Sequence, residues 1–176
     1  DSATTILARL QNGQQGVANI YDNANKIFNL RKGLPLGATT WGAGSIGASS
    51  ISTLMKDLRK RFSGDDANHL DWRLARGYNV AEVAARVRTF IYEEHYVDAF
   101  KDWNPKPVLG FVVAGYSHGL GMAEEYLIQV DEKGACAQPS PLRRLEESGV
   151  TWNGEVEAIS RLVQGISPMA AMVLHQ

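Results

Sequence analysis

The sequence has few of the features that mark specialised classes of protein. Its 176 residues include one cysteine, Cys136, which has no second cysteine with which to form an internal disulfide bond. Neither sign of charge dominates, because 18 basic residues stand against 19 acidic ones. This balance gives no electrostatic reason to expect a nucleic acid or an anionic membrane as partner. No apolar run approaches the roughly 20 residues that span a bilayer, so no membrane-spanning segment is predicted.

Internal repeats, low-complexity tracts and a basic-then-apolar signal segment are also missing from the sequence. We therefore predict one domain over residues 1–176 and a cytoplasmic location. The four histidines lack metal-ligand spacing, and no metal or cofactor is predicted. A strand pattern starts almost at the first residue and the last residues are strongly apolar, whereas domain termini are usually polar. This predicts an internal portion of a longer chain.

Hydrophobic periodicity predicts strands, then two helices, then further strands and a last helix. The apolar stripe of the first helix repeats at i, i+3, i+4 and i+7, and Asn79 with Glu82 gives the second helix an N-cap and a capping-box position. Because hairpin signals dominate over strand–helix–strand crossovers, the α+β class with antiparallel sheets is favoured. Strands are predicted over residues 4–10, 17–21, 26–30, 36–41, 108–115 and 125–131, and helices over 51–62, 79–100 and 154–163.

Three short motifs occur in an order that is typical of one family. Asp1-Ser2-Ala3-Thr4, Asn25-Lys26-Ile27-Phe28 and Thr39-Thr40-Trp41-Gly42-Ala43-Gly44 resemble the aspartate strand, the lysine strand and the glycine-rich strand end of proteasome-type N-terminal-nucleophile hydrolases. The later segments 112–134 and 152–165 resemble the hairpin and the helix that follow in that family. The closest similarity is to its uncharacterised bacterial branch.

The resemblance implies a four-layer αββα sandwich of antiparallel sheets, incomplete at both ends of this chain. It implies a threonine-type hydrolase of peptide or amide bonds that needs no cofactor and assembles into a homo-oligomer or ring. The nucleophile is expected to be absent from this chain, in a segment before Asp1. A non-catalytic structural subunit of the same fold is the main alternative.

The same resemblance assigns roles to four residues. Lys26 is the lysine whose ammonium lowers the pKa of the nucleophile and its α-amine, and Asp1 is the carboxylate that orients it. The backbone N–H of Gly42 is the expected oxyanion donor. Thr40 is expected to line the adjoining substrate pocket.

A different class of function is indicated by Gly42, Gly44 and Gly47, which form a literal G-x-G-x-x-G after a predicted strand. This pattern is typical of dinucleotide-binding proteins, in which a second buried strand ends in an acidic residue. Asp65 and Asp66 lie at a suitable distance, but the residues before them do not form a strand pattern. The preceding hairpins also oppose a parallel βαβ unit.

The remaining polar features have ordinary interpretations. The mixed-sign run from Lys56 to Arg61 is predicted to be a solvated helix face, and His95 to be a helix-surface residue. Ser117 and His118 are predicted to lie in a surface loop, because adjacent residues of an extended segment point apart. The segment 65–78 is predicted to be a long loop that affects assembly.

Overall fold

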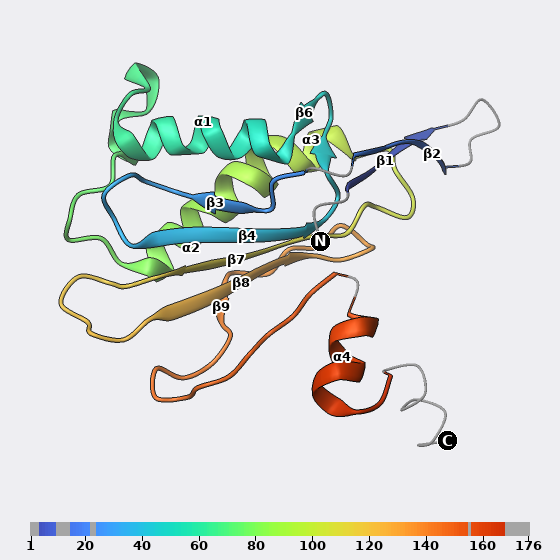
Figure 1. Ribbon diagram of the computed structural model, residues 1–176. Coiled ribbons are helices and arrows are strands. Elements are labelled where there is room, and N and C mark those ends of the chain that lie inside the picture. The colour runs from blue at the N-terminus through green and yellow to red at the C-terminus, as the bar shows by residue number, and fades with distance from the viewer. Residues whose placement is uncertain (1–3, 10–14, 22–23, 155, 168–176) are drawn as a thin grey trace. The chain divides into compact units, whose positions relative to one another are not determined.

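The structure is a computed structural model of the chain and describes residues 4–9, 15–21, 24–154 and 156–167. The chain divides into two compact units, residues 1–146 and residues 147–176. Figure 1 shows that the first unit holds the sheets and most of the helices, whereas the second holds helix α4. A single domain over the whole chain stays a prediction.

An antiparallel sheet of five strands in the order β3-β4-β7-β8-β9 forms the centre of the first unit. The α+β class and the antiparallel order predicted from the sequence are therefore confirmed. Two further pairs, β1 with β2 and β5 with β6, are also antiparallel. The strands are β1 Thr4–Arg9, β2 Gln15–Tyr21, β3 Ile27–Asn29, β4 Leu36–Gly42, β5 Ser45–Ile46, β6 Ser49–Ser50, β7 Leu109–Gly115, β8 Glu124–Val130 and β9 Ser140–Pro141.

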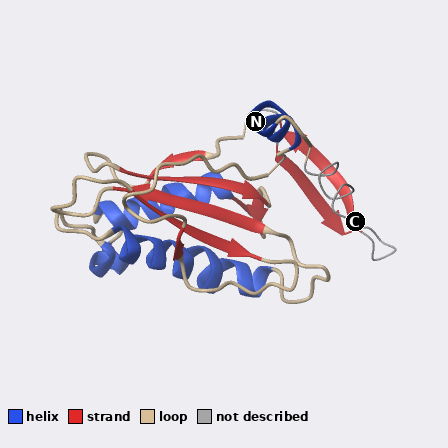
Figure 2. Ribbon diagram, turned by 90° about the horizontal axis from the view of Figure 1, so that it is seen from below, coloured by secondary structure: helices blue, strands red, loops and turns tan. Residues whose placement is uncertain are grey.

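The helices of the first unit cover one face of this sheet (Figure 2). The second predicted helix is found, but it changes geometry along its length: an α-helix continues without a break into a π-helix and a last short α-helical turn. A 3₁₀ helix lies in the segment that joins it to α1. The bounds are α1 Ile51–Ser63, η1 Ala67–Trp72 (3₁₀), α2 Val80–Arg88, η2 Thr89–Tyr96 (π) and α3 Val97–Ala99.

Helix α1 has a well-defined cap at each end. The Ser50 side chain accepts a hydrogen bond from the Thr53 N–H at 3.1 Å, and so satisfies one of the free amides of the first turn. Gly64 follows the last residue with φ 81, a left-handed conformation that glycine adopts readily. The Asn79 side chain caps α2 in the same way through the amides of Ala81 and Glu82, as the sequence predicts.

The core lies between the helices and the sheet face that they cover. Alternate strand residues point to this face, and they are the buried ones. The predicted apolar stripe of α1 is buried against them, together with one side of α2 and η2. Central members of this core are Leu36, Ala38, Ile51, Leu54, Met55, Leu58, Phe62, Val80, Val83, Val87, Phe90, Phe111, Val113 and Ile128.

The opposite face of the sheet carries apolar side chains that are not buried within the first unit. Ile27 is 73% exposed, and Trp41, Val112 and Leu127 are half-buried. The Trp41 ring lies over Gly110, where an added Cβ would meet it at 2.1 Å. An antiparallel sheet that faces water usually has polar residues on its outer side. Here polar residues such as Thr39 and Gln129 share this face with the apolar ones.

The second unit contains helix α4, Glu157–Gln164. The indole N–H of Trp152 donates to the Ser160 hydroxyl at 3.1 Å, which ties the preceding segment to the helix. Gly165, in the left-handed conformation with φ 74, ends the helix. None of the helices in the described ranges is both long and apolar enough to cross a membrane.

Candidate functional site

The start of β3 and the end of β4 bring together two of the residues singled out in the sequence. The Thr40 N–H donates to the Lys26 carbonyl at 3.0 Å, which continues the β3–β4 pairing by one residue beyond Ile27 and Thr39. Residues directly opposite each other in an antiparallel pair project to the same face. Lys26 and Thr40 therefore share the helix-covered face, at one end of the sheet, and Lys26 is half-buried there.

Gly42 ends β4 in a conformation that only glycine adopts easily. Its φ is +87, and a Cβ added to it would lie 2.3 Å from the Val108 carbonyl oxygen. Both facts require glycine at this position whatever its role in catalysis. Fold alone thus accounts for Gly42, and an oxyanion role is an additional hypothesis.

The hydrogen-bond ladder sets the direction of the Gly42 amide. Along a strand, successive N–H groups point alternately to the two neighbouring strands. The Ala43 N–H donates to the Val108 carbonyl at 2.9 Å on the β7 side, and the Thr40 N–H donates to Lys26 on the β3 side. The alternation directs the Gly42 N–H to the side of Lys26, past the point where β3 begins.

The Thr40 hydroxyl donates to the Gly110 carbonyl oxygen at 2.9 Å. It thereby joins β4 to β7 from the side chain, two residues before Gly42. The substrate-pocket role expected for Thr40 is not tested by this contact, because the hydroxyl also has acceptor capacity for a second partner. Asp1 lies outside the described residues, so its pairing with Lys26 stays a prediction.

The glycine cluster after β4 leads into helix α1 through the short β5–β6 hairpin. The Ile51 N–H at the start of α1 donates to the Gly44 carbonyl at 3.0 Å, so the helix begins beside the glycines. A dinucleotide fingerprint needs the next strand of the sheet to be parallel to the first. β4 instead pairs antiparallel with β7, and every strand pair among the described residues is antiparallel. The described strands therefore do not form the βαβ unit that a dinucleotide fingerprint at Gly42, Gly44 and Gly47 requires. Nucleotide binding there stays an untested alternative.

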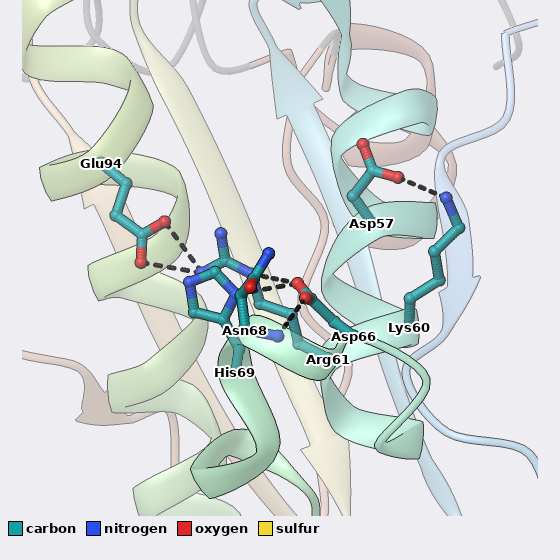
Figure 3. A network of polar contacts seen from close by, with 7 residues as sticks. All are labelled: Asp57, Lys60, Arg61, Asp66, Asn68, His69 and Glu94. Carbon is teal, nitrogen blue, oxygen red and sulfur yellow. Dashed lines mark hydrogen bonds and ion pairs between the residues drawn. The ribbon is translucent and has the colours of Figure 1, made fainter.

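A second polar cluster, centred on Arg61, lies between α1 and η2 (Figure 3). The Arg61 side chain is only 12% exposed, so the prediction of a solvated helix face is wrong at this residue. Its guanidinium carbon lies 4.7 Å from the centre of the Phe90 ring and 5.1 Å from that of Trp72. Nη1 donates to both carboxylate oxygens of Glu94 at 3.0 and 2.9 Å. Stacking and ion pairing together fix the guanidinium.

Asp66 connects this cluster to helix η1. Its carboxylate accepts from the Asn68 N–H at 3.0 Å and contacts His69 Nδ1 at 2.8 Å, and it lies 3.6 Å from Arg61 Nε. The hydrogen bond from Asn68, and then that with His69, holds the pKa of the Asp66 carboxyl below its usual value of 3.8. The segment predicted to be a loop is thus partly helical and is anchored to α1.

His95 differs from its sequence prediction as a helix-surface residue. It lies in the π-helix, where its ring is 4.7 Å from that of Phe90. Its Nε2 is shielded from solvent and has no hydrogen-bond partner among the described residues. No periodicity in the sequence indicates this burial, because a π-helix shifts the register of the side chains that follow.

Ser117 is a further residue whose environment the sequence does not reveal. It is 5% exposed, not in an open surface loop as predicted, and its Oγ accepts from the Val80 N–H at 2.9 Å. Its own hydroxyl donates to the Glu124 carboxylate. Ser117 therefore joins the start of α2 to the β7–β8 hairpin. The contact links residues far apart in the chain, and no local pattern predicts it.

Comparison with known proteins adds no assignment to this geometry. No protein-family model matches the sequence, and no curated protein is significantly similar to it.

Proposed function

We propose that the chain is part of a proteasome-like N-terminal-nucleophile hydrolase that cleaves amide or peptide bonds. The observation that supports this best is the arrangement of Lys26, Thr40 and Gly42 at one end of the sheet. Lys26 is half-buried at the start of β3, and the main-chain amide of Gly42 on the neighbouring strand β4 is directed to the side of Lys26. The proposed chemistry requires a cation and an N–H donor near the same reacting carbonyl.

In the proposed reaction, a threonine, serine or cysteine outside this sequence attacks the substrate carbonyl, and its α-amine takes the proton. The Lys26 ammonium favours the deprotonated nucleophile by its charge, and Asp1 holds the ammonium in place. The Gly42 N–H donates to the oxyanion of the tetrahedral intermediate. The carbon–nitrogen bond then breaks, the leaving amine takes the proton, and water hydrolyses the acyl-enzyme.

We also propose that the sheet is one of two that pack face to face in a four-layer αββα sandwich. The apolar side chains of Ile27, Trp41 and Val112 on the outer face support this, because a second layer would remove those side chains from water. The β1–β2 hairpin is the proposed start of that second sheet. A cytoplasmic location and assembly into a homo-oligomer or ring belong to the same proposal, and mass photometry of the full-length protein tests the assembly.

The decisive experiment uses the full-length protein with its native N-terminus. Mass spectrometry identifies the mature N-terminal residue, and an electrophilic peptide that acylates N-terminal nucleophiles tests whether it reacts. We expect covalent labelling and hydrolysis of fluorogenic peptide amides, with Lys26→Ala lowering both by at least about 10²-fold and the exposed-site control Lys56→Ala leaving both unchanged. A folded protein that neither labels nor hydrolyses any substrate would support the non-catalytic subunit instead. Equal activity of Lys26→Ala and Lys56→Ala would refute the assigned site.

A further inference from the structure

A hollow lies beside Arg61, between α1 and η2, and its lining includes none of Lys26, Thr40 and Gly42. It has a volume of about 440 Å³ and is lined by groups from α1, from the turn that follows it and from the π-helix η2. Its walls include Lys60, Arg61, Asp65, Asp66, Phe90 and His95. The volume suits a small molecule.

Both signs of charge reach this hollow. Arg61 is held by Glu94 through Nη1, and within the described part of the chain its Nη2 has no protein hydrogen bond. Lys60 pairs with Asp57 at 3.0 Å, but both side chains are largely exposed, and such pairs are weak. Asp65 is exposed at the rim and has no ion pair among the described residues. Cationic and anionic groups are therefore available side by side.

The mixture of charges selects the class of ligand. An inorganic anion would approach Arg61 but would also meet the carboxylates of Asp65 and Asp66. A metal cation would meet Lys60 and Arg61, and no group of three or more metal-ligating side chains occurs in the described residues. A molecule that carries one carboxylate and one ammonium a few bonds apart matches both sets, while Ala67 offers it an exposed apolar contact.

The π-helix supplies an independent observation. His95 lines the hollow, and its Nε2, which is shielded from solvent, has no hydrogen-bond partner within the part of the chain that the structure describes. Unsatisfied buried polar atoms are rare in folded proteins, and each calls for an explanation such as a functional role or an ordered water. π-helical turns occur frequently at functional sites for a related reason, since they place side chains where an α-helix does not.

We propose that this hollow binds a free amino acid or a zwitterionic dipeptide. The ligand carboxylate contacts Nη2 of Arg61 and the Lys60 ammonium. Its ammonium contacts Asp65, and its aliphatic side chain lies against Ala67. This binding does not depend on the proposed hydrolase activity, because no residue of the strand-end site takes part.

The test is a binding measurement on the full-length protein by isothermal titration calorimetry and thermal shift. L-Leucine and Leu-Leu are compared with N-acetyl-L-leucine, which keeps only the carboxylate, and with L-leucinamide, which keeps only the ammonium. We expect L-leucine or Leu-Leu to bind, and each blocked compound to bind at least roughly tenfold more weakly than the free form, because one charge-assisted contact is lost.

Two exposed carboxylates give a matched pair of variants that preserve the fold. Asp65→Asn is expected to weaken leucine binding by roughly tenfold, and Asp102→Asn, which lies outside the hollow, is expected to leave it unchanged. Circular dichroism confirms that both variants are folded. The proposal is overturned if none of the four compounds binds, if the acetylated or amidated compound binds as well as leucine, or if the two variants behave alike.

Discussion

Replacing Gly42 by alanine tests the strand-end geometry most directly, because the chain offers a nearly perfect control at Gly33. Both glycines have positive φ, +87 at Gly42 and +80 at Gly33. Around Gly33 there is nothing within 4 Å of an added Cβ, whereas at Gly42 the Cβ would lie 2.3 Å from the Val108 carbonyl oxygen. Both substitutions place alanine in the left-handed backbone region, but only Gly42→Ala also creates a steric clash.

The expected magnitudes follow from these contacts. Alanine in the left-handed region costs about 1 kcal/mol, which is the whole expected loss for Gly33→Ala. At Gly42 the strands β4 and β7 must also separate locally, which adds about 1–3 kcal/mol of overpacking. Part of that loss is the hydrogen bond from Ala43 to Val108. We expect Gly42→Ala to lower the free energy of unfolding by about 3 kcal/mol in total.

Urea unfolding followed by tryptophan fluorescence measures both variants under the same conditions. Gly42→Ala should be less stable than Gly33→Ala by about 2 kcal/mol. Equal losses would refute the close approach of Val108 to Gly42, and with it the proposed direction of the Gly42 amide. A smaller loss at Gly42 than at Gly33 would refute the strand pairing itself.

Three further outcomes are expected. Ser117→Ala leaves the Val80 N–H and the Glu124 carboxylate without their buried partner, so the free energy of unfolding should fall by about 2 kcal/mol in urea titrations; a loss below about 0.5 kcal/mol would contradict this role. Burial raises the pKa of Tyr96 to about 12 from its usual 10.0, so the folded state should lose stability as the pH rises from 10 through 12. Tyr96→Phe should reduce that loss in alkaline unfolding monitored by circular dichroism, while Tyr78 and Tyr126, whose pKa values burial also raises, account for the rest. Because the pKa of Asp66 is lowered in the folded state, its carboxylate stabilises the fold above the usual pKa of 3.8, and this stabilisation is lost as the pH falls through the lower folded-state pKa. NMR titration of Asp66 should show the low pKa. A pKa at the usual value would contradict the contacts with Asn68 and His69.

The sequence predicts the elements of this fold well where one periodicity covers a whole element. The stripe from Ile51 to Phe62 and the Asn79 cap give α1 and the start of α2 because both signals are local. The π-helical continuation of α2 is not predicted, since π-helical turns are rare insertions within α-helices and the α-helical period, from which the helix is predicted, does not indicate them. The π-helix also places His95 beside Phe90 within the same element, and the burial of Arg61 depends on Phe90 from a different helix.

The candidate site divides in the same way. The order of Lys26 and Gly42 along the chain is visible in the sequence, but their proximity depends on the register of β3 against β4 and on the shortness of β3. A shift of one residue would move Lys26 to the opposite face of the sheet. Burial fixes the register, because Phe28 and Ala38 lie opposite each other and both are buried in the core.

Lys26 is therefore a better reporter of function than Gly42. The fold uses the Lys26 backbone, because its carbonyl accepts from Thr40, and any residue other than lysine would supply the same carbonyl. Gly42 is required by sterics before any catalytic role is considered. The Lys26 side chain, by contrast, takes no part in the backbone hydrogen bonds of the β3–β4 pairing. If Lys26→Ala keeps the stability of the fold and removes reactivity toward an electrophilic peptide, the lysine serves chemistry; if it changes neither, the site assignment fails while the fold stands.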